Sequence, residues 1–92
     1  MNQSVTAEAT IRNELGLHAR AATKLVEVAS AFEADLFLSR DGREVNGKSI
    51  MGVLLLTATR GSVIGIRGEG PDAEELVRAV AELIENKFEE EK

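Results

Sequence analysis

Hydrophobic and polar residues alternate near the start of the chain, and the pattern then changes period. Small and aliphatic residues occupy every second position at Val5, Ala7, Ala9 and Ile11. A period of two predicts a half-buried strand, because successive side chains of a strand point to opposite faces. After the turn expected at "NELG", residues 19–32 follow a helical period. The apolar stripe of this predicted helix contains Ala22, Leu25, Val26, Ala29 and Phe32.

The middle of the chain predicts a hairpin followed by a short helix. "DLFLS" (residues 35–39) is typical of a strand, and Asp41-Gly42 follows it. Both residues tolerate positive φ, so they predict a two-residue hairpin turn with a return strand over residues 44–46. Gly47 ends that strand. Ser49 is then placed to cap a short helix over residues 50–56.

The last third predicts one more strand and one long helix. "SVIGIRG" (residues 62–68) is the strand, and Asp72 is expected to begin the helix. Glu75 follows three residues later, which is the spacing of a capping box. The buried face of the helix is predicted to contain Ala73, Leu76, Val77, Val80, Leu83, Ile84 and Phe88. The acidic end, "EEEK", is expected to be a frayed, solvated terminus.

These elements give the order β-α-β-β-α-β-α. Strands in which apolar and polar residues alternate have one solvent-exposed face. The expected packing is therefore an antiparallel sheet with helices on its other face. The predicted fold is therefore α+β, a two-layer open-faced sandwich. A chain of 92 residues without linkers or repeats is expected to be a single domain, residues 1–92.

Composition excludes several classes of site and partner. The chain has no cysteine, so disulfides and thiolate metal sites are excluded. Its net charge of −5 argues against nucleic-acid binding. The longest apolar run, residues 53–56, is far too short to cross a membrane, and "MNQSVTAEAT" lacks the features of a signal peptide. An intracellular protein fits these observations.

The only histidine, His18, stands where the first helix is predicted to begin. Arg20 and Lys24 follow it with no acid between them, although the positive end of a helix dipole disfavours cations. An anion would compensate, because the first amide groups of a helix lack partners and bind anions. Arg20 adds a planar donor fork that suits phosphate. The hypothesis is that neutral His18 acts as a nucleophile and receives a phosphoryl group there.

Other functions of these residues have weaker support in the sequence. A lone histidine is more often structural, and zinc would have to use carboxylates alone beside His18. A serine hydrolase lacks support because "GxSxG" is absent and no acid is obviously placed to orient His18. "GEGPDA" (residues 68–73) matches a dinucleotide fingerprint only poorly, since its acids would repel a pyrophosphate. A turn and a helix cap explain it better.

Lys48 and the short predicted helix indicate a docking surface. Ile50, Met51 and Leu54 fall on one face of that helix, where exposed apolar residues would meet a partner protein. The alternative, that all three belong to the core, is equally supported. Ser49 is fully explained as a helix cap unless this surface has a function.

"GLHARAA", followed about thirty residues on by "NGKSIMGVLLL", resembles the HPr family, the histidine-containing phosphocarriers of the phosphoenolpyruvate-dependent phosphotransferase system. The resemblance covers nearly the whole chain. It implies four antiparallel strands with three helices on one face, and phosphorylation of His18 on Nδ1 with Arg20 beside it. It also implies that Ser49 is a regulatory phosphorylation site. The implied docking residues are Leu17, Ile50, Met51 and Leu54. We expect Arg20, Lys24 and Lys48 to give this surface a positive rim.

The resemblance further implies a cytoplasmic, monomeric carrier rather than a free-standing enzyme, without cofactor or metal. Enzyme I would supply the phosphoryl group, IIA domains of sugar permeases would receive it, and HPr kinase/phosphorylase would modify Ser49. One residue departs from the family, since Ala21 stands where most members have proline. The sequence therefore does not decide whether the chain belongs to the branch of the family for sugar uptake, to the branch for nitrogen-linked regulation or to another pathway. The alternative function is a regulatory binding module that acts mainly through protein contacts.

Overall fold

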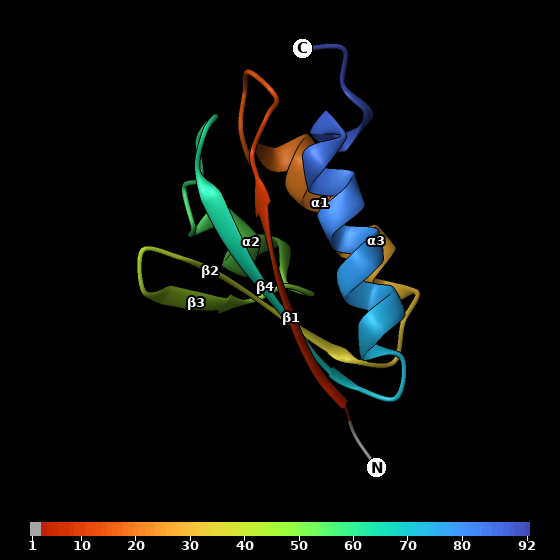
Figure 1. The fold of residues 1–92 in the computed structure, drawn as a ribbon. Helices are drawn as coiled ribbons and strands as arrows, with labels where there is room; N and C mark the ends of the chain where they lie inside the picture. Colours follow the sequence, from red (N-terminus) through yellow and green to blue (C-terminus); the bar gives the residue numbers. More distant parts are fainter. Residues whose placement is uncertain (1–2) are drawn as a thin grey trace.

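The computed structural model describes residues 3–92, and its strands form one antiparallel sheet in the order β1-β4-β2-β3 (Figure 1). The strands are β1 (Gln3–Thr10), β2 (Asp35–Arg40), β3 (Arg43–Asn46) and β4 (Val63–Gly70). The helices are α1 (Ala19–Ser30), α2 (Ile50–Leu54) and α3 (Ala73–Glu85), followed by a short helical turn, η1 (Lys87–Glu89). The predicted order of elements is confirmed. Within residues 3–92, no helix combines the length and the apolar character that a membrane span requires.

The two faces of the sheet differ in the way that the alternating pattern predicts. The face under the helices carries side chains that are almost completely buried, namely Ala9, Leu36, Leu38, Ile64 and Ile66. On the opposite face, Arg67 lies 4.2 Å above the ring of Phe37 and forms an ion pair with Glu44. One face is therefore packed and the other meets water, as expected for an antiparallel sheet covered on one side.

Helices α1 and α3 lie side by side over the packed face, and α2 packs against α1 (Figure 1). The buried stripe of α3 is confirmed from Ala73 to Ile84, while Phe88 is buried beyond the end of the helix. Of the predicted stripe, Val26 in α1 and Phe32 just beyond its end are only half-buried, and Ala21 is buried although it was not predicted to be. Both helices thus present small and aliphatic side chains to the sheet.

The hairpin and the short helix follow local rules that the sequence reveals. Asp41 and Gly42 have φ values of 51° and 82°, which is the left-handed pair that a tight hairpin turn requires. The Ser49 hydroxyl accepts a hydrogen bond from the Gly52 amide at 3.1 Å, so the predicted cap of α2 is confirmed. The helix ends at Leu54 rather than at residue 56, because the Leu56 and Thr57 amides bond to carbonyls only three residues back.

The predicted capping box of α3 is wrong, because the Asp72 side chain faces another part of the chain. Its two carboxylate oxygens accept hydrogen bonds from the amides of Glu33 and Ala34, at 3.0 and 2.8 Å. These bonds, from Glu33 first and then from Ala34, lower the pKa of Asp72. Asp72 therefore fastens the loop between α1 and β2 to the start of α3 instead of capping its own helix.

Replacing Asp72 by Asn should destabilise the fold at neutral pH, because an amide offers one acceptor oxygen where the carboxylate offers two. The folded pKa of Asp72 is depressed, so its contribution is complete above the unfolded value of about 3.9 and disappears as the pH falls through the folded pKa. Urea unfolding of both proteins from neutral to strongly acidic pH measures this. The difference in stability should shrink with acid. A difference that stays constant with pH would contradict it, and Asp35→Asn, at an exposed acid, serves as the control.

Candidate functional site

The loop that leads into α1 is seated tightly on the segment that follows α2. Gly16 has a φ of 69°, and a Cβ atom added there would lie 2.5 Å from the Ala58 carbonyl oxygen. The next amide, that of Leu17, donates to the same oxygen at 2.9 Å. Only glycine combines the left-handed backbone with this close approach. The turn predicted at this position therefore fixes the position of His18, which follows Leu17.

His18 is the N-cap residue of α1, with extended backbone angles. Its carbonyl accepts the first helical hydrogen bond, from the Ala22 amide at 2.8 Å, while its side chain caps no amide. The first turn of α1 contains no acidic residue. The amides at the start of this helix are thus left without a side-chain acceptor, which is the arrangement that favours an anion.

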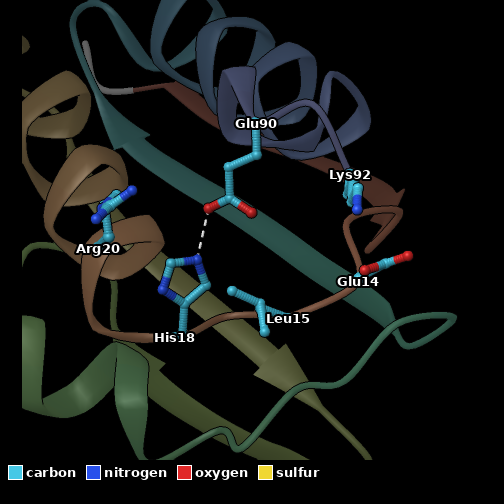
Figure 2. Close-up of a pocket in the computed structure, with 6 residues that line it drawn as sticks. All are labelled: Glu14, Leu15, His18, Arg20, Glu90 and Lys92. Atoms are coloured by element: carbon cyan, nitrogen blue, oxygen red, sulfur yellow. Dashed lines mark hydrogen bonds and ion pairs between the residues drawn. The ribbon is translucent and has the colours of Figure 1, made fainter.

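The imidazole of His18 contacts the carboxylate of Glu90, which approaches from the end of the chain (Figure 2). Nε2 of His18 lies 2.5 Å from Oε2 of Glu90, and the two side chains are 25% and 19% exposed. The second ring nitrogen points away from Glu90, toward the start of α1 (Figure 2). The prediction of a frayed, solvated C-terminal segment is therefore wrong, and an acid does orient His18.

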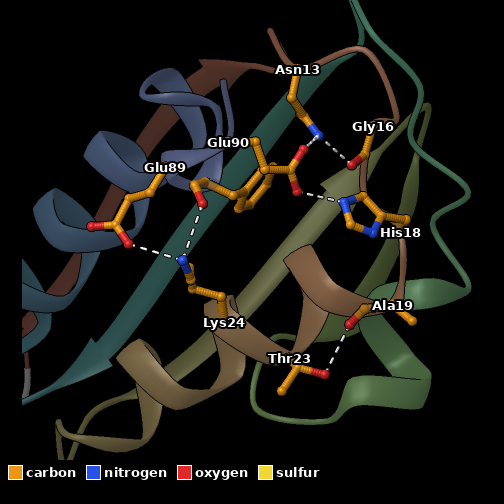
Figure 3. A network of polar contacts seen from close by, with 9 residues as sticks. Asn13, Gly16, His18, Ala19, Thr23, Lys24, Glu89 and Glu90 are labelled. Carbon is orange, nitrogen blue, oxygen red and sulfur yellow. Dashed lines mark hydrogen bonds and ion pairs between the residues drawn. The ribbon is translucent and has the colours of Figure 1, made fainter. Parts of the chain in front are cut away.

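Further contacts hold the last residues against α1 and the preceding loop (Figure 3). Oε1 of Glu90 accepts a hydrogen bond from Nδ2 of Asn13 at 3.0 Å, and the same amide group donates to the Gly16 carbonyl at 2.8 Å. Lys24 forms an ion pair with Glu89 at 2.9 Å. Asn13 is completely buried, so its position is set by packing as well as by these bonds.

The chain reaches this position through an unusual left-handed turn. Lys87, Phe88 and Glu89 have φ values of 60°, 54° and 65°. For residues with a side chain, this conformation costs about 1–2 kcal/mol each. The Phe88 ring, only 1% exposed, is packed in the core and offsets that cost. The burial of Phe88, just beyond the end of α3, thus places the carboxylate of Glu90 beside His18.

Glu90 remains ionised in this environment. Burial alone would raise its pKa, but the hydrogen bonds from His18 and Asn13 and the positive charges nearby outweigh burial and lower the pKa below its ordinary value. The carboxylate is therefore an acceptor at both oxygens. Neither Glu90 nor Asn13 was identified from the sequence, because the contacts span more than seventy residues.

Arg20 and His18 line one open pocket of about 480 Å³. The remaining lining residues are Glu14, Leu15, Glu90 and Lys92 (Figure 2). Arg20 is exposed and forms no ion pair within residues 3–92. Its guanidinium is thus available to an incoming anion. Within the same residues, no group of three potential metal ligands is brought together.

The predicted docking residues divide into exposed and buried positions. Ile50 and Met51 are exposed, whereas Leu54 is half-buried against the core. Leu17, also predicted to dock, is only 6% exposed and packs in the core, so it offers a partner little surface. Leu15 and Leu55, which the sequence analysis missed, are 72% and 58% exposed.

The lysines predicted at the rim of the docking surface already have partners. Lys24 is paired with Glu89, and Nζ of Lys48 donates to the Phe32 carbonyl at 2.7 Å. Ser49 lies half-buried at the start of α2, next to the exposed Ile50. Exposed apolar side chains therefore come from the loop before α1, where Leu15 lines the pocket of His18, and from α2 and its C-terminal end.

Comparisons with known proteins point to one family. Residues 5–86 match the model of the family described as PTS HPr component phosphorylation site. The chain is 53% identical to the phosphocarrier protein HPr of Xylella fastidiosa over 90% of this chain and 93% of that protein. It is 40% identical to the phosphocarrier protein NPr of Shewanella violacea, over 90% and 91%. The crystal structure of HPr-C-His from Thermoanaerobacter tengcongensis superposes with a TM-score of 0.87 at 42% identity, covering 98% and 99%.

Replacing Phe88 by Ala should release the C-terminal segment and destabilise the fold by about 3–5 kcal/mol, which is the cost of truncating a buried phenylalanine. Urea unfolding gives the stability, and amide hydrogen exchange of residues 87–92 reports the release. The exposed Leu15→Ala should change neither measurement by much. Unaltered exchange in the Phe88 variant would show that the hydrogen bonds, and not the ring, anchor the segment.

Proposed function

The chain belongs to the HPr family, the phosphocarriers of the phosphotransferase system, and from this premise we propose that His18 is the residue that carries the phosphoryl group. The observation that supports this assignment is the position of the imidazole. His18, the only histidine, stands at the start of α1 in the same open pocket as Arg20. No other imidazole in the chain could accept the group.

In this proposal the residues of the pocket accept, bind and orient the phosphoryl group, and no further catalytic group is required. The phosphoryl group would arrive on the side of the ring that faces the start of α1, where Nδ1 is its acceptor. The guanidinium of Arg20 and the amides of the first turn would hold the phosphoryl oxygens, since charge-assisted hydrogen bonds to phosphate are strong and directional. Ala21 retains an amide that proline would lack, so this chain offers one more donor in that turn.

The donor and the acceptors are proteins that dock beside the pocket. Enzyme I of the phosphotransferase system would supply the phosphoryl group in the cytoplasm, and IIA domains of sugar permeases would remove it. The surface that supports docking contains Leu15, Ile50, Met51 and Leu55, all of them exposed. Leu54 contributes only its half-buried side chain. The chain itself acts as a transfer intermediate and not as a free-standing enzyme.

A second function, regulation through Ser49, is favoured by the position of that hydroxyl. Ser49 caps α2 and lies next to Ile50 in the proposed docking surface. A phosphate added by HPr kinase/phosphorylase would be tolerated by the helix start, whose dipole favours negative charge. It would be unfavourable for docking, because a buried charge without a partner must lose its water. Ser49 would thus control the access of partners rather than the stability of the domain.

His18→Ala should fold normally and accept no phosphoryl group. The measurement is the intact mass after incubation with phosphoenolpyruvate and Enzyme I, before and after treatment with acid. The unmodified chain should gain one acid-labile phosphoryl group. The variant Asp41→Asn, in the remote hairpin turn, should be labelled like the unmodified chain. Undiminished acid-labile labelling of His18→Ala would refute the assignment.

Ser49→Asp should weaken binding to Enzyme I by roughly 1–3 kcal/mol without destabilising the fold. Ser49→Asn is the matched control, because Asn and Asp are comparable helix caps and differ in charge. Calorimetric titration gives the affinity, and thermal melting gives the stability. Equal affinities of the two variants would show that a charge at this position does not affect docking. A collapse in melting temperature for Asp alone would instead make Ser49 a structural residue.

A further inference from the structure

We propose that Glu90 is a positioning residue for phosphoryl transfer: it holds the proton of His18 on Nε2 and so leaves the lone pair of Nδ1 facing the start of α1. This inference rests on the proposed function of His18. It assigns a role to Glu90 in the C-terminal segment, which the sequence predicted to be frayed and solvated. It also accounts for the short contact between two residues that lie 72 positions apart.

The first step of the argument concerns the proton between the two groups. Nε2 and Oε2 are 2.5 Å apart, which requires a hydrogen bond with one proton between the atoms. An ionised carboxylate can only accept, so Nε2 is the donor. When the imidazole is neutral it has a single N–H, and Nδ1 then carries no proton. The tautomer that Glu90 selects is the one whose free lone pair lies on the side of the ring facing α1 (Figure 2).

The second step concerns the precision with which Glu90 is held. Its other oxygen, Oε1, accepts from the completely buried Asn13 amide at 3.0 Å. Asn13 is itself fixed by its bond to the Gly16 carbonyl. The backbone before Glu90 adopts three consecutive left-handed residues, which the buried Phe88 maintains. Strain of this kind is often found where a functional group must be placed accurately.

The third step concerns the charge that develops during transfer. The lone pair of Nδ1 forms the N–P bond while the bond from phosphorus to the leaving atom of the donor breaks, and that electron pair stays on the donor. The proton remains on Nε2, so the ring gains positive charge. Glu90 lies at the opposite side of the ring from the incoming group. Its carboxylate therefore stabilises the ring charge that is larger in the transition state than in the free protein.

The test uses the complete chain with phosphoramidate, a small phosphoryl donor that needs no partner protein. Glu90→Gln preserves the size of the side chain and removes its charge. Glu91→Gln makes the same change at the neighbouring exposed acid, which forms no ion pair within the described residues. The ¹⁵N shifts of the two ring nitrogens, at a pH where the ring is neutral, report the tautomer. The initial rate of acid-labile phosphorylation reports the reaction.

In the unmodified chain and in Glu91→Gln, the proton should reside on Nε2. In Glu90→Gln, a second population with the proton on Nδ1 should appear, and the rate should fall roughly tenfold, the factor expected when a charge-assisted hydrogen bond becomes a neutral one. An unchanged tautomer and rate, or a faster reaction that would make Glu90 inhibitory, would overturn the proposal. If the unmodified chain accepts no phosphoryl group, the proposed function fails instead.

If Glu90→Gln disturbs the packing of the C-terminal segment, Asn13→Ser provides an independent test. It removes the hydrogen bond to Oε1 while leaving the charge of Glu90 and its direct contact with His18 in place. A smaller shift toward the Nδ1 proton and a smaller loss of rate than in Glu90→Gln are expected. Normal tautomer populations in both variants would contradict a positioning role for Glu90.

Discussion

The packing of Phe88 in the core is the interaction on which the site depends. Because the ring is buried just beyond α3, the chain turns back in a left-handed conformation and brings Glu90 to His18. The last residues thus complete a pocket whose other residues come from the loop before α1 and from its first turn. Without this anchor, the imidazole would meet solvent at both nitrogens, and neither its tautomer nor its direction would be fixed.

Local signals in the sequence were sufficient to predict the fold. Alternation in β1, the Asp41-Gly42 turn and the Ser49 cap each depend on residues close together in the chain, and the structure confirms all three. That His18 and Arg20 belong to one site was also visible, because cations at a helix start without acids break a local electrostatic rule. The family resemblance added what such rules cannot supply, namely Nδ1 as the expected acceptor atom and the expected partner proteins.

Other features could not be predicted because they arise from contacts between distant segments. Asp72 has the spacing of a capping residue, yet its carboxylate binds amides about forty positions earlier. Leu17 matches the family's docking residues, but the close seating of Gly16 on Ala58 turns its side chain into the core. The acidic run at the C-terminus has the composition of a frayed end, and only the position of Phe88 could have indicated that it folds back.

The central claim is that His18 carries the phosphoryl group on Nδ1 while Glu90 holds the proton on Nε2. The most direct measurement is ³¹P–¹⁵N NMR of the ¹⁵N-histidine-labelled chain after phosphorylation by phosphoenolpyruvate and Enzyme I. A one-bond phosphorus coupling to Nδ1, together with a proton on Nε2 that is protected from exchange, is the expected result. Coupling of phosphorus to Nε2, or a phosphorylated chain whose ring shows no coupling, would contradict the account.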